Sequence, residues 1–353
     1  MWPATWLKRL FGAPARSGEA DERSRAVQAF VAARLGRLSM PIELARPDAG
    51  GIEARIFAAL MSKRFRKKSV SPRQQAGIRE SIWRCVARGA PLKLCFPFGG
   101  YKLWRFAEAP EADWAELFSI MHYANWLRPV ALGYAPGVEF TFASDAIVLE
   151  RISNIAPPET AAYATSFAAL LEFLARFVPN NLVFSYMTFG SLYPPGAFEA
   201  ELQEWVQESW ARNGGKPPAL SDPARRGIDL NVRLRPGQAD DSEWREKVHI
   251  VHHAYYQMRK RCDYLRDPER IIVFPAPLSH ENCIPVGSTR ASIAKFWVGV
   301  GALRQRGGGF VETVLTPSQA AAARFDWVPV AIPGLPQRNF SRLRILTDAS
   351  GPA

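Results

Sequence analysis

The sequence has few cysteines and no long hydrophobic run, and these two absences exclude several classes of protein. Its four cysteines lie far apart without a Cys-x-x-Cys pair. This excludes a disulfide scaffold and a cysteine-rich metal cage, and it indicates a reducing compartment, so we expect a cytoplasmic protein. No stretch of about 18 uncharged apolar residues is present, so we expect no membrane span. The apolar start of the chain is interrupted by Lys8 and Arg9, which is not typical of a signal peptide.

The common cofactor and nucleophile signatures are also missing. There is no P-loop, no His-Glu-x-x-His pair and no serine nucleophile elbow, and Gly299-Val-Gly301 lacks the third glycine of a dinucleotide fingerprint. His249, His252 and His253 fall on one predicted helix, where His249 and His253 would share a face, but no third ligand is evident. We therefore predict neither a metal nor a cofactor.

What the sequence does have is a large apolar fraction and an excess of positive charge near one end. Apolar residues make up 48% of the 353 positions and charged residues 22%, a composition typical of a folded globular protein with a large core. Residues 1–68 contain 14 basic and 6 acidic side chains, a net charge of +8 out of the total of +12. An anionic partner is therefore favoured, but the low charge elsewhere argues against a nucleic-acid reader built along the whole chain.

Apolar segments alternate with helical patterns from residue 23 onward. Residues 72–88 have Ser71 as a helix N-cap, and Leu92–Phe98 is typical of a strand buried on both faces. The remaining expected helices are 23–37, 52–67, 111–126, 158–177, 198–212 and 241–266, and the remaining strands are 129–133, 138–142, 182–187, 270–274, 293–302 and 309–316. This order predicts a Rossmann-like α/β fold with a mostly parallel sheet, a helical N-terminal region and a C-terminal helical and antiparallel extension.

The same pattern divides the chain into four predicted parts. They are a basic tail and linker (1–22), a helical N-terminal region (23–90), a Rossmann-like core (91–215) and a C-terminal helical and β-hairpin portion (216–353). In open α/β sheets the ligand crevice lies beyond the carboxyl ends of the strands. Two polar segments are expected at these strand ends: the turn 98–102, which contains Gly99-Gly100 and Lys102, and the pair Ser144-Asp145.

Three short segments carry the candidate chemistry. Lys102, which follows a glycine turn, can hold a carboxylate or phosphate or act as an acid or base, although a solvated lysine after a structural turn has the same pattern. Asp145 can orient an amine or act as a base, although Ser and Asp are also common helix caps. Arg290, within the hydroxyl-rich segment 287–292, offers a forked set of donors to an anion.

Beyond these residues, the order of motifs resembles the isonitrile synthases of the pyoverdine/dityrosine biosynthesis family, over residues 56–316. The matching pieces are Pro97-Phe98 with Lys102, Pro110 to Leu117, Tyr134-Ala-Pro-Gly137, Ser144-Asp145 and the helix around Tyr163. Departures are Phe274-Pro275, where the family has His-Pro, and Lys295 to Gly299, where it has Thr-Pro-Trp-His-Gly.

The resemblance implies a Rossmann-like transferase or lyase of secondary metabolism that joins an aromatic amino acid's amine to the ketone of ribulose 5-phosphate. On this basis Lys102 and Asp145 are the expected catalytic residues, and substrate would be bound by Arg290, Ser144, Ser288 and Tyr134. The partners would be small molecules, without nucleic acid. The departures also fit a divergent branch with other substrates.

Two alternatives belong to other classes. One is a protein that binds nucleic acid or another anionic surface through its basic N-terminal region, residues 1–68, which includes the run Lys63 to Lys68, although that run also suits the solvated end of a helix. The fold can also be a catalytically silent scaffold.

Overall fold

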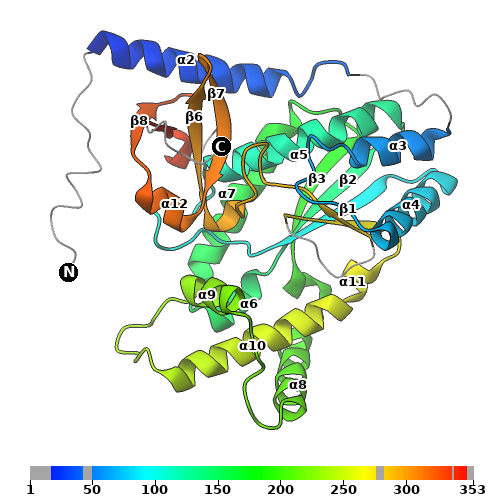
Figure 1. Cartoon of the computed structure of the whole chain (residues 1–353), viewed down its shortest axis with the longest axis vertical. Helices are drawn as coiled ribbons and strands as arrows, with labels where there is room; N and C mark the ends of the chain where they lie inside the picture. The colour runs from blue at the N-terminus through cyan, green and yellow to red at the C-terminus, as the bar shows by residue number, and fades with distance from the viewer. Residues whose placement is uncertain (1–16, 43–49, 276–281, 336–337, 348–353) are drawn as a thin grey trace.

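The computed structural model describes residues 17–42, 50–275, 282–335 and 338–347, and shows an α/β protein with two sheets (Figure 1). The expected basic tail 1–22 lies mostly outside these residues. The helices are α2 (Ser17–Gly36), α3 (Ile52–Leu60), α4 (Pro72–Ala87), α5 (Trp114–Gly133), α6 (Ala146–Ile152), α7 (Pro157–Ala175), α8 (Ala197–Arg212), α9 (Asp222–Asn231), α10 (Ser242–Arg261), α11 (Asp263–Arg266) and α12 (Pro317–Ala322). The strands are β1 (Leu92–Phe98), β2 (Val138–Ser144), β3 (Leu182–Thr188), β4 (Arg270–Phe274), β5 (Cys283–Pro285), β6 (Val300–Arg306), β7 (Gly309–Leu315), β8 (Phe325–Pro329) and β9 (Arg342–Leu346).

The first sheet contains five parallel strands in the order β3-β2-β1-β4-β5. The predicted α/β class is confirmed, and β1 and β4 have the predicted bounds. Strands β2 and β3 are added on one side of β1, and β4 and β5 are added on its other side. The strand order therefore reverses between β1 and β4. A reversal of this kind is where doubly wound sheets place their ligand crevice.

Helix α5 is enclosed by the two sheets. It packs against β2 and β3 on one side and against β6 and β7 on the other, which explains why nearly all of its side chains are buried. The predicted strand 129–133 is wrong: α5 continues through Pro129 to Gly133. Proline inside a helix costs about 3 kcal/mol, and here the burial of Val130 and Ala131 offsets that cost.

The second sheet has the order β7-β6-β9-β8 and follows the first in the chain. The β6-β7 hairpin is present as predicted, but it belongs to this separate sheet and not to an edge of the parallel one. The expected strand 293–302 begins only at Val300, because Phe296–Val298 form a 3-10 turn. Helix α2 lies across this sheet (Figure 1), and the ion pairs Arg23–Asp326 and Arg34–Glu312 hold it there.

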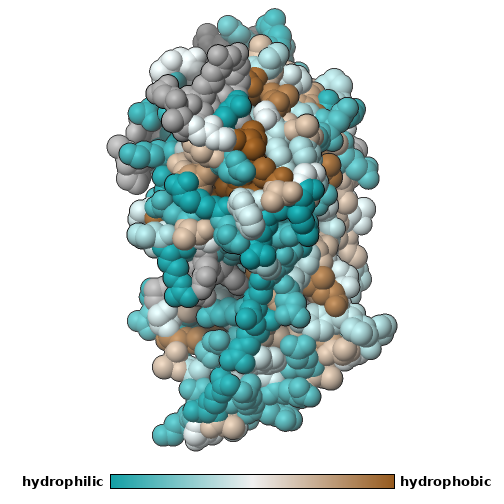
Figure 2. Space-filling view, turned by 90° about the vertical axis from the view of Figure 1, so that its right-hand side faces the viewer, coloured by the Kyte–Doolittle hydropathy of each residue, from teal (hydrophilic) through white to brown (hydrophobic). Residues whose placement is uncertain are grey.

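Helices α6, α8, α9 and α10 form a separate layer with its own apolar core, at the bottom of Figure 1. The sequence pattern did not indicate α9, which is short and contains a proline and a glycine. Among the described residues, no helix is long and apolar enough to cross a membrane. Figure 2 shows a mainly hydrophilic face, with apolar side chains gathered in its upper part.

Candidate active site

A cavity of about 640 Å³ lies between the carboxyl edge of the parallel sheet and the helical layer. Phe98 and Gly99 line it from the end of β1, Asp145 from the end of β2 and Phe274 from the end of β4. The cavity therefore lies where the strand order reverses, as the sequence predicted for the turn 98–102 and for Ser144-Asp145. Residues of α9 and α10 form the opposite wall.

The Gly99-Gly100 turn allows the end of β1 to approach its neighbours closely. Gly100 has a φ of +71°, and a Cβ there would lie 1.7 Å from Ser144 Oγ. A Cβ on Gly99 would lie 2.7 Å from the Trp297 ring. Both glycines are therefore required for the wall of the cavity to close around Asp145 and Trp297.

Asp145 is the central carboxylate of the cavity. Its Oδ2 accepts a hydrogen bond from Arg259 at 2.6 Å, and its Oδ1 accepts one from the Tyr255 hydroxyl. Both partners come from α10, and the side chains of Asp145 and Arg259 are only 15% and 8% exposed. Burial raises the pKa of Asp145 and the Arg259 charge opposes that effect. The pair thus presents a fixed acceptor to a ligand amine.

Two further titratable groups line the same cavity. Lys295 belongs to the turn before β6, and His252 lies on α10. Loss of hydration lowers the pKa of Lys295, with a further contribution from Arg259, while Asp145 opposes it. Burial and then the charges of Arg259 and Lys295 lower the pKa of His252 to about 4. At neutral pH His252 is therefore a neutral imidazole, which can accept a proton or a hydrogen bond.

The rest of the lining is suited to a planar, mostly apolar ligand with an anionic end. Phe98, Phe274 and Trp297 form an apolar wall, and Tyr256 lies opposite on α10. Lys260 adds an exposed cation at one side. Aromatic walls with a few polar groups are typical of small-molecule sites.

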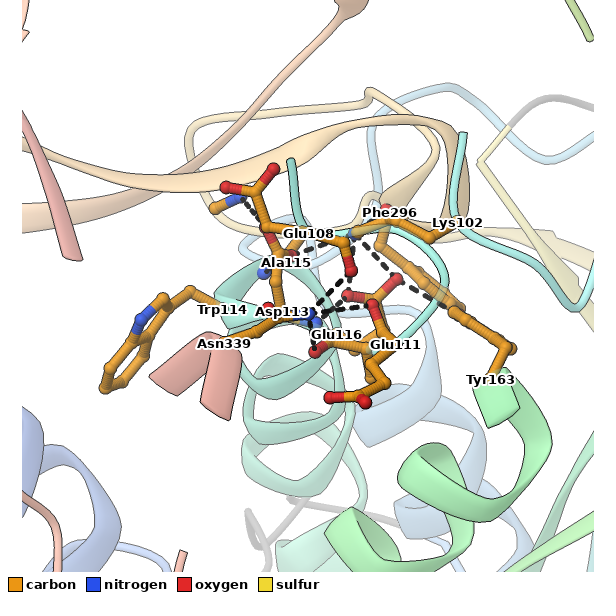
Figure 3. Close-up of polar contacts among 12 residues, drawn as sticks. Lys102, Glu108, Glu111, Asp113, Trp114, Ala115, Glu116, Tyr163, Phe296 and Asn339 are labelled. Atoms are coloured by element: carbon orange, nitrogen blue, oxygen red, sulfur yellow. Dashed lines mark hydrogen bonds and ion pairs between the residues drawn. The ribbon is translucent and has the colours of Figure 1, made fainter. Parts of the chain in front are cut away.

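Lys102 lies next to this cavity in a buried ion cluster (Figure 3). Its side chain is fully buried, and its Nζ donates to Asp113 Oδ1 at 2.8 Å and to both carboxylate oxygens of Glu116 at 2.8 and 2.9 Å. It also donates to the Phe296 carbonyl oxygen at 3.2 Å. Since Phe296 separates Lys295 from Trp297, Lys102 fixes the turn that carries two lining residues.

The charges of this cluster are nearly balanced. Burial raises the pKa of Asp113, but the charges of Lys102 and Arg344 outweigh it, so that pKa lies below its usual value. Burial raises the pKa of Glu116; the charge of Lys102 opposes this effect and that of Asp113 adds to it. Tyr163 donates its hydroxyl to Glu116 at 3.0 Å. Both carboxyl groups therefore share the charge of Lys102, and Arg344 adds a second cation beside Asp113.

The other sequence-derived candidates lie apart from the cavity lining. Ser144 is buried behind Asp145, where its Oγ accepts from the Ala146 backbone N–H at 3.1 Å. Tyr134 donates to the Ala90 carbonyl at 2.7 Å, at the amino end of β1. Ser288 is buried and donates to the Ala294 carbonyl, and Arg290 is exposed. Of the six candidates, Asp145 lines the cavity.

The residues that sequence reasoning missed come mostly from α10. His252, Tyr255, Tyr256 and Arg259 are spaced three, four and seven positions apart, a helical period that places them on one face. This spacing could have predicted from the sequence that these four side chains share one face of the helix. His249 is not among the lining residues and contacts Asp229 Oδ1 at 2.9 Å, and no group of metal-ligating side chains occurs in the described part of the chain.

Comparisons with known proteins give a structural relative but no sequence relative. No family model matches the sequence, and no curated protein matches it. The crystal structure of PvcA from Pseudomonas aeruginosa is similar, with a TM-score of 0.56 and 18% sequence identity over 84% of this chain and 100% of PvcA. At this identity the comparison shows a shared fold.

Proposed function

We propose that the protein is a biosynthetic enzyme similar to isonitrile synthases, which joins the amine of an amino acid to the ketone of ribulose 5-phosphate. The observation that carries the proposal is the cavity at the strand reversal, with Asp145 held between Tyr255 and Arg259 on its wall. The motif order, which resembles that of the isonitrile synthases, supports it, and the fold shared with PvcA is consistent with it.

In this proposal each part of the cavity binds one part of the substrates. Asp145 accepts hydrogen bonds from the amino-acid amine, and the aromatic wall of Phe98 and Trp297 holds an aromatic side chain. The exposed Lys260 offers a cation to the sugar phosphate. His252, neutral at physiological pH, is placed to accept a proton during condensation.

Lys102 has a positioning role in this scheme. It is buried in its ion cluster and reaches the cavity through the Phe296 carbonyl. It therefore sets the position of the segment that carries Lys295 and Trp297.

The test is mass spectrometry of the purified protein incubated with a mixture of amino acids and ribulose 5-phosphate. Conversion of an amine to an isonitrile adds one carbon and removes two hydrogens. We expect this product from the wild type and its loss in Asp145→Asn. Asp240→Asn is the matched control, because Asp240 is an exposed carboxylate that pairs with Arg245. Absence of the product from the wild type, with no thermal stabilisation by either substrate, would contradict the proposal.

A further inference from the structure

The cavity contains one lysine whose surroundings suit covalent chemistry. Lys295 is accessible from the cavity, and it forms no ion pair or hydrogen bond with the described part of the chain. Its Nζ lies 5.6 Å from the ring centroid of Trp297 and 5.8 Å from that of Phe274. Its amine is therefore available to a ligand in the cavity, in contrast to that of the fully paired Lys102 nearby.

The surrounding charges favour the neutral, nucleophilic form of this amine. Loss of hydration and the charge of Arg259 lower the pKa of Lys295. The carboxylate that opposes this effect, Asp145, is already engaged by Arg259 and Tyr255. An amine with a lowered pKa beside apolar side chains is the setting in which lysines attack carbonyl carbons.

We propose that Lys295 forms an imine with the ketone of the sugar phosphate before the amino-acid amine reacts. This step rests on the proposed function, which supplies the ketone of ribulose 5-phosphate as the substrate. The Nζ lone pair attacks the carbonyl carbon, a C–N bond forms, and the oxygen takes up the proton released by nitrogen. The C–O bond then breaks, and water leaves with a second proton. No electrons are gained or lost.

Asp145 is placed to assist the loss of water. Asp145 and Lys295 line the same cavity and each shifts the pKa of the other. The Asp145 carboxylate can accept the proton that nitrogen releases and pass it to the leaving hydroxyl. The amino-acid amine then adds to the imine carbon and Lys295 departs as a free amine, which leaves the substrates joined as an imine.

The experiment is reductive trapping of the whole protein with ribulose 5-phosphate and sodium cyanoborohydride, in the absence of any amino acid. We expect a mass gain equal to the sugar phosphate less one oxygen atom, located at Lys295 by peptide mapping. Lys295→Arg keeps the positive charge but should lose the adduct, and so should Lys295→Gln. Lys247→Arg is the control, because Lys247 is an exposed lysine of α10 that pairs with Glu243 outside the cavity lining, and it should retain the adduct.

The possible outcomes separate this inference from the proposed function. The trapping is repeated with dihydroxyacetone phosphate as a second ketone. An adduct located at Lys260 instead of Lys295, or no adduct with either ketone, would overturn the proposed imine. If the wild type makes an isonitrile without a trapped adduct, the function stands and the imine fails. If the adduct forms at Lys295 without an isonitrile, the imine stands and the reaction must be revised. Thermal unfolding of each variant shows whether a lost adduct reflects a lost fold.

Discussion

At the scale of single residues, His122 shows how a position in the core sets the charge state of a side chain. It lies on α5 with 7% of its surface exposed, and its ring packs 5.0 Å from that of Phe65. Its Nε2 has no hydrogen-bond partner among the residues described. Burial, followed by the charges of Lys67, Arg34 and Arg64, lowers the pKa of His122 to about 3. The folded protein thus holds this histidine neutral.

The stability of the protein should therefore depend on His122 in mildly acidic solution. Unfolded histidine has a pKa of about 6.5, so between that pH and about 3 the unfolded chain binds a proton that the folded chain does not. The contribution is fully present above about 6.5 and is lost as the pH falls, by up to about 1.4 kcal/mol per pH unit. In His122→Leu, urea unfolding at a series of pH values should show a shallower loss. Equal slopes in the two proteins would contradict this assignment, since all other groups are shared.

At the scale of elements, the Lys102 cluster joins the loop after β1 to α5 and to the turn before β6. In Lys102→Met, Asp113 would keep a buried charge without its nearest partner, so we expect a loss of about 3–5 kcal/mol in the free energy of unfolding. The double variant Lys102→Met/Asp113→Asn should recover part of that loss. It should not recover product formation, because the Phe296 carbonyl still lacks its donor.

Lys93 provides the control for this prediction. It lies on β1, pairs with Glu269 at 3.1 Å and is partly exposed, so Lys93→Met should cost at most about 1 kcal/mol. Chemical denaturation with the product assay distinguishes the outcomes. A Lys102→Met protein with wild-type stability, or a double variant with full activity, would show that Lys102 does not hold the turn.

The elements that could be predicted from the sequence are those with local signals. Short-range patterns were enough to predict the buried strand β1, the glycine turn and the carboxylate after β2. The position of the crevice was predicted from the same patterns. The inward orientation of Lys102 depends on Asp113 and Glu116 of the following segment, and its link to the cavity depends on Phe296, which follows 194 positions later. The prediction ended helix α5 too early for a similar reason: the sheets that pack against it include distant segments such as β6 and β7. Long-range contacts of this kind leave no periodicity in the sequence.

At the scale of the whole molecule, the structure shows that some of the basic side chains near the N-terminus form ion pairs within the fold. Arg23 and Arg34 pair with the second sheet, while Val27, Val31 and Leu35 of the same helix are buried in the main core. Deleting residues 1–68 would therefore expose that core, and it cannot separate an enzyme from an anion-binding protein. The exposed cations of the basic run, Lys63, Arg64 and Lys68, give a cleaner test.

We expect the triple variant Lys63→Gln/Arg64→Gln/Lys68→Gln to keep its thermal stability and its product formation, because these exposed side chains lie apart from the cavity. Duplex DNA binding measured over a range of salt concentrations tests the alternative. Each phosphate contact contributes about 0.9 to the slope of log K against log salt, so a run that binds DNA would lose up to about 3 in this variant. A reduced slope, together with an absence of amino-acid product from the wild type, would favour the binding protein over the enzyme. An unchanged slope with intact product formation would assign the basic run to the solvated surface of an enzyme.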